Sequence, residues 1–409
     1  MGGLGLCSAP RTALAASWAS WADTLPMLQA RNPRLAASVL LHLSASSAPQ
    51  TSPFSEVSAS AATLRHEGFV NLPTWNEILA GVRPDIPNQV MEPREPGEWL
   101  HGWQFYAAAA RDTHFRSNSL FPRISGAHRA LLRSQSGPCS GRVFTCSPTS
   151  SEFSFTASHY RTLLLRRLRL PISFINRQCS YSRNLDALGD HRAACPISGF
   201  LRRRAIPLEV AAARVCREAG ARVSQNVFLR DMNVPGIDPA DGRQIEVVAN
   251  GLPTYGGVQL AIDTTLVSPL TRDGLPHPNT EHTNGARLET ALQRKIDKYP
   301  EFEEATRCRL VTIAIEVGGR WDSSAVHFIR QLAVAKARSQ PPALRFSTEL
   351  AFFYRWTSLL SVAALRSLAC SLNENDAGTA LNVDGDEPQL EDVLHASRLD
   401  EPASFSRLF

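Results

Sequence analysis

Two charged residues stand where apolar side chains are expected, and they single out one stretch of the chain. Asp263 lies in the middle of the aliphatic run 260–267, which is typical of a strand covered on both faces. Lys295 falls inside the apolar stripe of a helix predicted over 286–299. That stripe consists of Leu288, Ala291, Leu292, Ile296 and Tyr299. A buried carboxylate is costly unless it is paired or holds a metal, so the pattern indicates either a functional site or a structural Asp–Lys pair.

Three further acids are candidates to join Asp263 around a divalent cation. Mg²⁺ and Mn²⁺ prefer oxygen ligands, and metal-assisted attack on a phosphate ester needs several converging carboxylates. The candidates are Glu209 on a predicted helix, Glu246 on the strand preceding that of Asp263, and Glu316 at the end of the last strand. For Glu316, a strand-end salt bridge is an equally good explanation. In such a site Lys295 would orient a water molecule or neutralise charge developing on phosphorus.

A second cluster contains the soft ligands that zinc prefers. Cys179, His191 and Cys195 supply three of the four ligands of a tetrahedral zinc site, and Tyr181 stands where a paired cysteine would provide another. The alternative is a metal-free turn around a core histidine. The triplet Arg202, Arg203 and Arg204 follows shortly afterwards. These arginines are expected either to contact nucleic-acid phosphates or to form a solvated basic face.

The elements that position these residues form a mixed α/β arrangement. The hydrophobic pattern predicts the order α-β-β-β-α-β with two appended helices. The predicted ranges are helix 207–219, strands 222–229, 244–249 and 258–267, helix 286–299, strand 309–317, and helices 323–338 and 343–372. The pair Asp241–Gly242 before the second strand is typical of a tight turn, although Asp241 is also a rival to Glu246 as a ligand.

The first half of the chain has the pattern of a mostly helical region. Helices are predicted over 11–43, with a break at Asn32–Pro33, and over 98–116, 125–133 and 158–170. A Ser/Pro-rich linker is expected at 44–60. We therefore divide the chain into four parts. These are a helical region 1–172, a Cys/His and basic element 173–205, an α/β domain 206–372 and an acidic mobile tail 373–409.

Composition limits the classes of protein to consider. The chain has 409 residues, 43% hydrophobic content and a formal net charge of +5, with arginine concentrated in its middle. This favours a globular protein with a polyanionic partner. The eight cysteines follow no disulfide framework, and no secretory signal or uninterrupted membrane span is evident. We expect a nuclear or intracellular protein that is not secreted and does not enter a membrane.

Several segments resemble the C-terminal part of reverse-transcriptase-bearing open reading frames of non-LTR retrotransposon type. They include LDALGDHRAACPISGFLRRRAIPLEVAAARVCREAGARV, EVVANGLPTYGGVQLAIDTTLVSPL, RKIDKYPE and EVGGRW. Upstream, GGLGLCSAPRTALAASWASWADTLPML and PGEWLHGWQF resemble the region that follows the polymerase thumb. The resemblance extends to about residue 372, and the polymerase itself is absent. It implies a restriction-endonuclease-like domain of the PD-(D/E)xK class.

This resemblance implies specific roles. Glu246 and Asp263 match the two metal-binding acids, and Lys295 and Lys298 match the lysines of a KxxKY signature. Glu209 matches a helix glutamate found in many members. The Cys/His cluster is similar to a zinc-knuckle-like element, from which one cysteine is missing at Tyr181.

The activity that the resemblance implies is nicking of target DNA to prime reverse transcription, with element RNA as a possible second partner. The first acid departs from the class pattern, because Glu246 stands where most members have an aspartate preceded by proline. The alternative function is a catalytically dead, nucleic-acid-binding remnant of the same fold.

Overall fold

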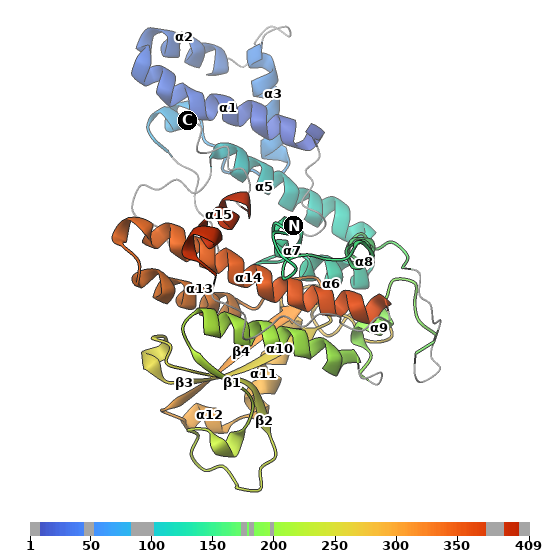
Figure 1. The fold of residues 1–409 in the computed structure, drawn as a ribbon. Coiled ribbons are helices and arrows are strands. Elements are labelled where there is room, and N and C mark those ends of the chain that lie inside the picture. The colour runs from blue at the N-terminus through green and yellow to red at the C-terminus, as the bar shows by residue number, and fades with distance from the viewer. Residues whose placement is uncertain are drawn as a thin grey trace. The chain divides into compact units, whose positions relative to one another are not determined.

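The computed structural model describes residues 9–44, 53–82, 102–172, 178–179, 184–196, 200–373 and 388–400 (Figure 1). These residues form two compact units, one ending at Ile124 and the other beginning at Ser125. The first unit is helical, and the second contains the only sheet among the described residues.

The helical unit is built around two tryptophans. Its elements are α1 (Ala9–Arg31), α2 (Pro33–Ser44), α3 (Pro53–His66), α4 (Trp75–Leu79), α5 (Trp103–Phe115), η1 (Arg116–Leu120) and η2 (Phe121–Arg123). Trp18 and Trp103 pack edge to face at 5.5 Å between ring centroids, in a core shared by α1, α3 and α5. The break predicted at Asn32–Pro33 is confirmed, since α1 ends at Arg31 and α2 begins at Pro33.

The linker predicted over 44–60 is wrong in its second part. Residues from Pro53 onward belong to α3. Val57, Ala61 and Leu64 recur at helical spacing and are buried in the core of this unit. Burial of this short apolar stripe therefore outweighs the Ser/Ala-rich composition on which the prediction relied.

The sheet has four strands in the order β1-β2-β3-β4. They are β1 (Arg222–Phe228), β2 (Gln244–Asn250), β3 (Gln259–Val267) and β4 (Cys308–Glu316). The first three are antiparallel neighbours, and β4 pairs in parallel with β3 after a crossover through α11 (Ala286–Lys298) and α12 (Glu301–Glu304). The mixed α/β class and the predicted order of elements are confirmed.

Helices cover both faces of the sheet (Figure 1). On one face lie α10 (Phe200–Glu218), α13 (Ser323–Arg338) and α14 (Pro342–Asn373), which bury Ile262 and Ile313. The other face carries a smaller cluster in which Tyr299 and Phe302 cover Val248. The short turns η3 (Leu229–Asp231) and η4 (Tyr255–Gly257) join the strands. Burial on both faces explains why β3 is almost continuously apolar.

The sheet-containing unit extends further toward the N-terminus than the domain predicted at 206–372. It also includes α6 (Gly126–Ser134), α7 (Arg142–Thr145), α8 (Ala157–Arg167) and α9 (Asp190–Ala194). Val143 of α7 and Leu163 of α8 share a core cluster with Leu368 of α14. The helices of 125–172 therefore cover α14 and do not belong to the N-terminal helical unit.

The acidic tail predicted to be mobile contains a helix. Residues Leu390–Asp400 form α15, and Val393 is buried against the core of α10 and α14. A single apolar face is enough to dock this otherwise polar helix. Residues 374–387 and 401–409 lie outside the described part of the chain.

No helix in the described ranges has an apolar segment of the length and hydropathy needed to cross a bilayer. The longest apolar stretch, 351–372, lies within α14, and most of its side chains are buried inside the sheet-containing unit.

Candidate active site

Asp263 and Lys295, which are 32 residues apart in sequence, are in direct contact. Asp263 lies in the middle of β3 with 1% of its surface exposed, and Lys295 Nζ donates to its Oδ1 at 2.5 Å. Leu288 and Ala291 anchor α11 by their burial, which turns Lys295 toward the sheet one to two turns later. The predicted approach of the acid and the amine on the same side of the sheet is therefore confirmed. The predicted apolar stripe is wrong at Ile296, which is 49% exposed.

Glu246 lies beside this pair because the two central strands diverge. The ladder between β2 and β3 contains Val247 opposite Ile262, and Glu246 is the next residue of β2 toward Asp263. The Thr264 N–H donates to Glu246 Oε2 at 2.6 Å, and its hydroxyl donates to the same oxygen at 2.8 Å. The Glu246 carboxylate thus accepts a hydrogen bond from a backbone N–H group of β3. This hydrogen bond fixes Glu246 next to Asp263.

The two carboxyl groups repel each other strongly. Burial raises the pKa of Glu246. The charge of Asp263 and a hydrogen bond between the two carboxyl groups raise this pKa further, to about 8, although Lys295 and Thr264 oppose the increase. Asp263 Oδ2 is buried and has no hydrogen-bond donor. Two adjacent carboxyl groups share a single lysine, and one of their oxygens accepts no hydrogen bond. Such a group of oxygen ligands is suited to binding a divalent cation.

Tyr299 and Arg243 connect the end of α11 to the start of β2. The Tyr299 hydroxyl donates to the Gln244 carbonyl at 3.1 Å, and Arg243 Nη1 donates to the Lys298 carbonyl at 2.5 Å. Arg243 also forms ion pairs with Asp241, at 2.7 Å, and with Glu301. These contacts set the distance between Lys295 and Glu246.

Sequence reasoning placed Tyr299 on an apolar stripe and, through the resemblance, at the end of the KxxKY signature, but it missed Thr264 and Arg243 as positioning residues. No local pattern marks them, because each acts through a partner distant in sequence. The ion pair of Asp241 with Arg243, together with a turn hydrogen bond from its N–H to the Asp238 carbonyl, makes Asp241 a turn residue and not a ligand.

Lys298 and Glu316 lie apart from this centre. Lys298 is exposed, with Nζ 4.6 Å from the centroid of the Tyr299 ring. Glu316 is four residues further along β4 than Thr312, the partner of Asp263, and so is about 13 Å away along the strand. Glu209 is half-buried on α10, which packs on the face opposite α11. Participation of Glu209 stays a prediction.

Glu316 is nevertheless an unusual acid. It is 2% exposed, and burial raises its pKa to about 7, against the opposing effects of Arg320, Ser134 and Arg287. Its Oε2 is buried without a hydrogen-bond partner, so both explanations that the sequence offers, a strand-end salt bridge and a metal ligand, stay predictions.

Cys179, His191 and Cys195 come together as the sequence predicts. All three are buried, and their ligand atoms lie within 4.8 Å of one another. The Asp186 carboxylate accepts from the N–H groups of Asp190, at 3.0 Å, and His191, at 2.6 Å, which fixes the start of α9. The cluster could hold a metal with three protein ligands, while Tyr181 lies outside the described residues.

The predicted phosphate contact of Arg204 does not agree with its position. Arg204 is 2% exposed and donates through Nη2 to the Ala193 carbonyl at 2.9 Å. Burial, together with the charge of Arg166, lowers its pKa to about 10. Arg204 therefore supports the turn that carries His191 and Cys195. The side chains of Arg202 and Arg203 lie outside the described part.

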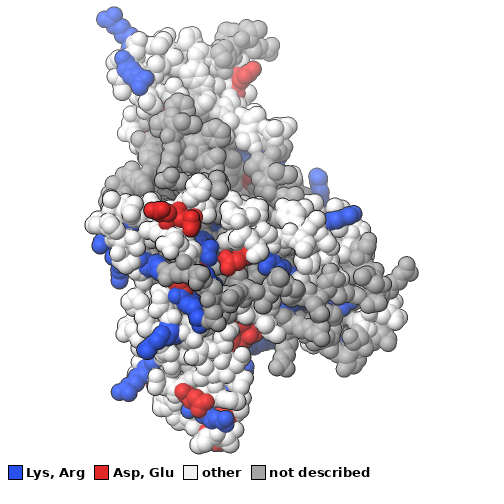
Figure 2. Space-filling model, in the orientation of Figure 1, with Lys and Arg blue, Asp and Glu red and all other residues white. Residues whose placement is uncertain are grey.

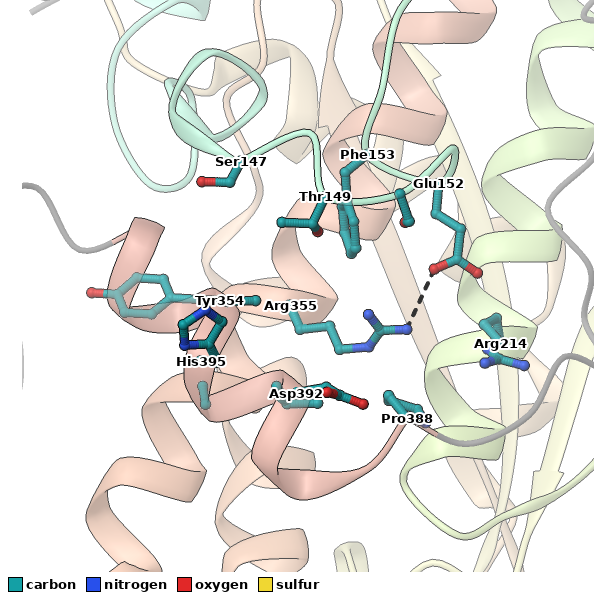
Figure 3. A pocket seen from close by; sticks show the side chains of 14 residues that line it. Ser147, Thr149, Glu152, Phe153, Arg214, Tyr354, Arg355, Pro388, Asp392 and His395 are labelled. Carbon is teal, nitrogen blue, oxygen red and sulfur yellow. Dashed lines mark hydrogen bonds and ion pairs between the residues drawn. The ribbon is translucent and has the colours of Figure 1, made fainter.

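A cavity of about 480 Å³ lies elsewhere in this unit, between residues 147–153, α10, α14 and α15 (Figure 3). Arg355 crosses it and pairs with Glu152 at 3.4 Å. None of Glu246, Asp263 and Lys295 lines this cavity. Because its central charges are paired, it offers no set of converging acids comparable with the pair at β2 and β3.

No family model, curated protein or solved structure matches this chain. Conclusions about function therefore depend on the geometry of the site.

Proposed function

We propose that the sheet-containing unit is a metal-dependent endonuclease with a restriction-endonuclease-like core, which nicks DNA for a retroelement. The proposal depends on one observation. Glu246 and Asp263 lie side by side on two diverging strands, Lys295 contacts Asp263, and one buried carboxylate oxygen has no donor. The observed element order α10-β1-β2-β3-α11-β4 supports the same class. The resemblance to retroelement reading frames suggests DNA as the substrate.

The residues divide the chemistry between them. Glu246 and Asp263 would hold Mg²⁺ or Mn²⁺, which supplies Lewis-acid activation of water and neutralises phosphate charge when bound. Lys295 stabilises the negative charge that develops on the phosphoryl oxygens as the P–O bond breaks. Thr264 holds the Glu246 carboxylate in place through two hydrogen bonds. Lys295 and Glu246 keep part of their surface exposed, so a phosphodiester reaches the site past them.

A second reading has one observation in its favour. The 2.5 Å contact between Lys295 and Asp263 satisfies one carboxylate oxygen without a metal. In a catalytically dead nucleic-acid-binding remnant, this pair would be purely structural.

A plasmid-nicking assay with Mg²⁺ or Mn²⁺ tests the proposal. Wild type should convert supercoiled to open-circular DNA, and Asp263→Asn should not. Asp297→Asn is the matched control, because Asp297 is an exposed acid on α11, the helix that carries Lys295. Salt-dependent DNA binding without nicking by the wild type would support the remnant, and absence of binding at low salt would leave only a structural pair.

For the second metal site we propose a structural zinc ion at Cys179, His191 and Cys195. The His191 Nε2 atom is buried without a hydrogen-bond partner, as expected of a ligand atom. Elemental analysis of the purified chain should give one zinc per molecule. It should give none for Cys195→Ser, and a metal-free wild type would contradict this assignment.

A further inference from the structure

The basic residues of α11 are segregated along one side of the helix. Arg287, Arg294 and Lys298 are spaced at i, i+7 and i+11, so they form a single stripe. This stripe borders the buried one that carries Lys295. The exposed acids of the helix, Glu289 and Asp297, lie about a quarter turn or more away, and Asp297 accepts from Gln293 at 2.8 Å.

Neither arginine of this stripe forms a close ion pair in the described part of the chain, where many other arginines do, and Glu316 is the acid whose charge acts on Arg287. Arg287 is half-buried, and its Nε is buried without a hydrogen-bond partner. His277 lies close to both guanidinium groups, since burial and then the charges of Arg287 and Arg294 lower its pKa. Positive charges that lie together and outnumber their acidic neighbour favour an anion.

A general basic surface does not explain this arrangement. On the face of the sheet-containing unit in Figure 2, acidic side chains are scattered among the lysines and arginines. The stripe on α11 differs because its charges are aligned and directly adjoin the carboxylate pair through Lys295.

We propose that Arg287, Arg294 and Lys298 contact three phosphates of one strand of duplex DNA and lead it past Lys295. The stripe covers 11 residues, or about 16 Å of helix, which corresponds to about five base steps at 3.4 Å each. This inference rests on the proposed nuclease function for the position of the cleaved phosphate. Binding itself is measurable without cleavage.

The test measures duplex DNA binding by fluorescence anisotropy over a range of salt concentrations, without divalent metal and in the full chain carrying Asp263→Asn. Each phosphate contact contributes about 0.9 to the slope of log K against log salt. The triple variant Arg287→Gln, Arg294→Gln, Lys298→Gln should reduce the slope by about 2.7. Arg294→Gln alone, at an exposed position, should reduce it by about 0.9 and guards against misfolding of the triple variant.

The matched control is a second triple variant with the same loss of charge, Arg222→Gln, Arg307→Gln, Arg338→Gln, at exposed arginines outside α11. Its slope should stay within about 0.5 of the parent slope. An unchanged slope in the α11 variants, or an equal change in both triple variants, would overturn the inference. A larger change on single-stranded RNA than on duplex DNA would overturn the choice of DNA. If wild type binds with the predicted slope but never nicks, the proposed function fails and the phosphate contacts stand.

Discussion

Glu218 and Asp263 are both buried acids of the sheet-containing unit, each 1% exposed, yet their surroundings are opposite. Glu218 accepts four hydrogen bonds. Arg214 Nε at 2.8 Å and Arg355 Nη2 at 2.8 Å donate to Oε1, and Arg355 Nε at 2.9 Å and Trp356 Nε1 at 2.9 Å donate to Oε2. Asp263 has one cationic donor, Lys295, and its other close partner is the second acid, Glu246.

The difference separates a structural acid from a candidate functional one. Burial raises the pKa of Glu218, but the hydrogen bonds and charge of Arg355, with Trp356 and Arg214, lower it below its ordinary value. At Asp263 the donors are too few, and the pKa of the neighbouring Glu246 rises to about 8. A carboxylate whose oxygens all accept hydrogen bonds stabilises the fold. A pair of carboxylates with too few hydrogen-bond donors retains affinity for a cation.

The largest expected effect is on stability at Glu218. Glu218→Ala leaves Arg214 and Arg355 buried without their acid, and it should cost about 3–5 kcal/mol of unfolding free energy. Urea denaturation of the sheet-containing unit measures this loss. Glu303→Ala, at an exposed position, is the control and should change it by less than about 0.5 kcal/mol. A small loss at Glu218 would show that the saturated network contributes little.

Asp263→Asn should have a large effect on nicking and a small effect on stability. Nicking should fall by about 10³-fold or more, which corresponds to about 4 kcal/mol of transition-state stabilisation. Stability should change by only about 1 kcal/mol, since loss of the Lys295 ion pair is offset by relief of the repulsion with Glu246. Single-turnover nicking and urea denaturation of the same variant provide the two values. A stability loss as large as that of Glu218→Ala would make Asp263 a structural acid as well.

Lys295→Met should have a smaller effect on nicking, of about 10²-fold, because it removes charge stabilisation but leaves both acids. The decrease should appear in kcat, with little change in DNA affinity. Lys298→Met should lower affinity and leave kcat nearly unchanged, which separates the two lysines of α11. Equal kinetic effects of the two variants would contradict their different roles.

A separate expected effect is a pH dependence of stability. Glu246 has an ordinary pKa of 4.5 and a folded-state pKa of about 8, so the folded state binds the extra proton between these values. Stability in the absence of metal should therefore fall as pH rises from about 4.5 to about 8. Glu246→Gln should remove this contribution. Urea denaturation midpoints in EDTA between pH 5 and pH 9 measure this pH dependence. Parallel pH profiles for wild type and Glu246→Gln would show that the pKa of Glu246 is not raised in the folded state.

The sequence predicted those features that depend on local periodicity. The strand around Asp263 has a continuous apolar run, and α11 has a stripe, so two charged residues inside these patterns were visible as exceptions. Features that depend on packing between segments distant in sequence were not predicted. The exposure of Ile296, the burial of Arg204 and the helix at 390–400 each depend on which surface packs nearby.

By itself, the sequence determined the order of the strands and helices and the chemical types of the site residues, because apolar spacing acts over a few residues at a time. Only the tertiary structure decided that Thr264 holds Glu246, that Arg243 and Tyr299 fix the end of α11, and that Asp263 retains an oxygen without a donor. These contacts join segments up to 55 residues apart. Strand register and helix docking set such distances, and no local pattern encodes them.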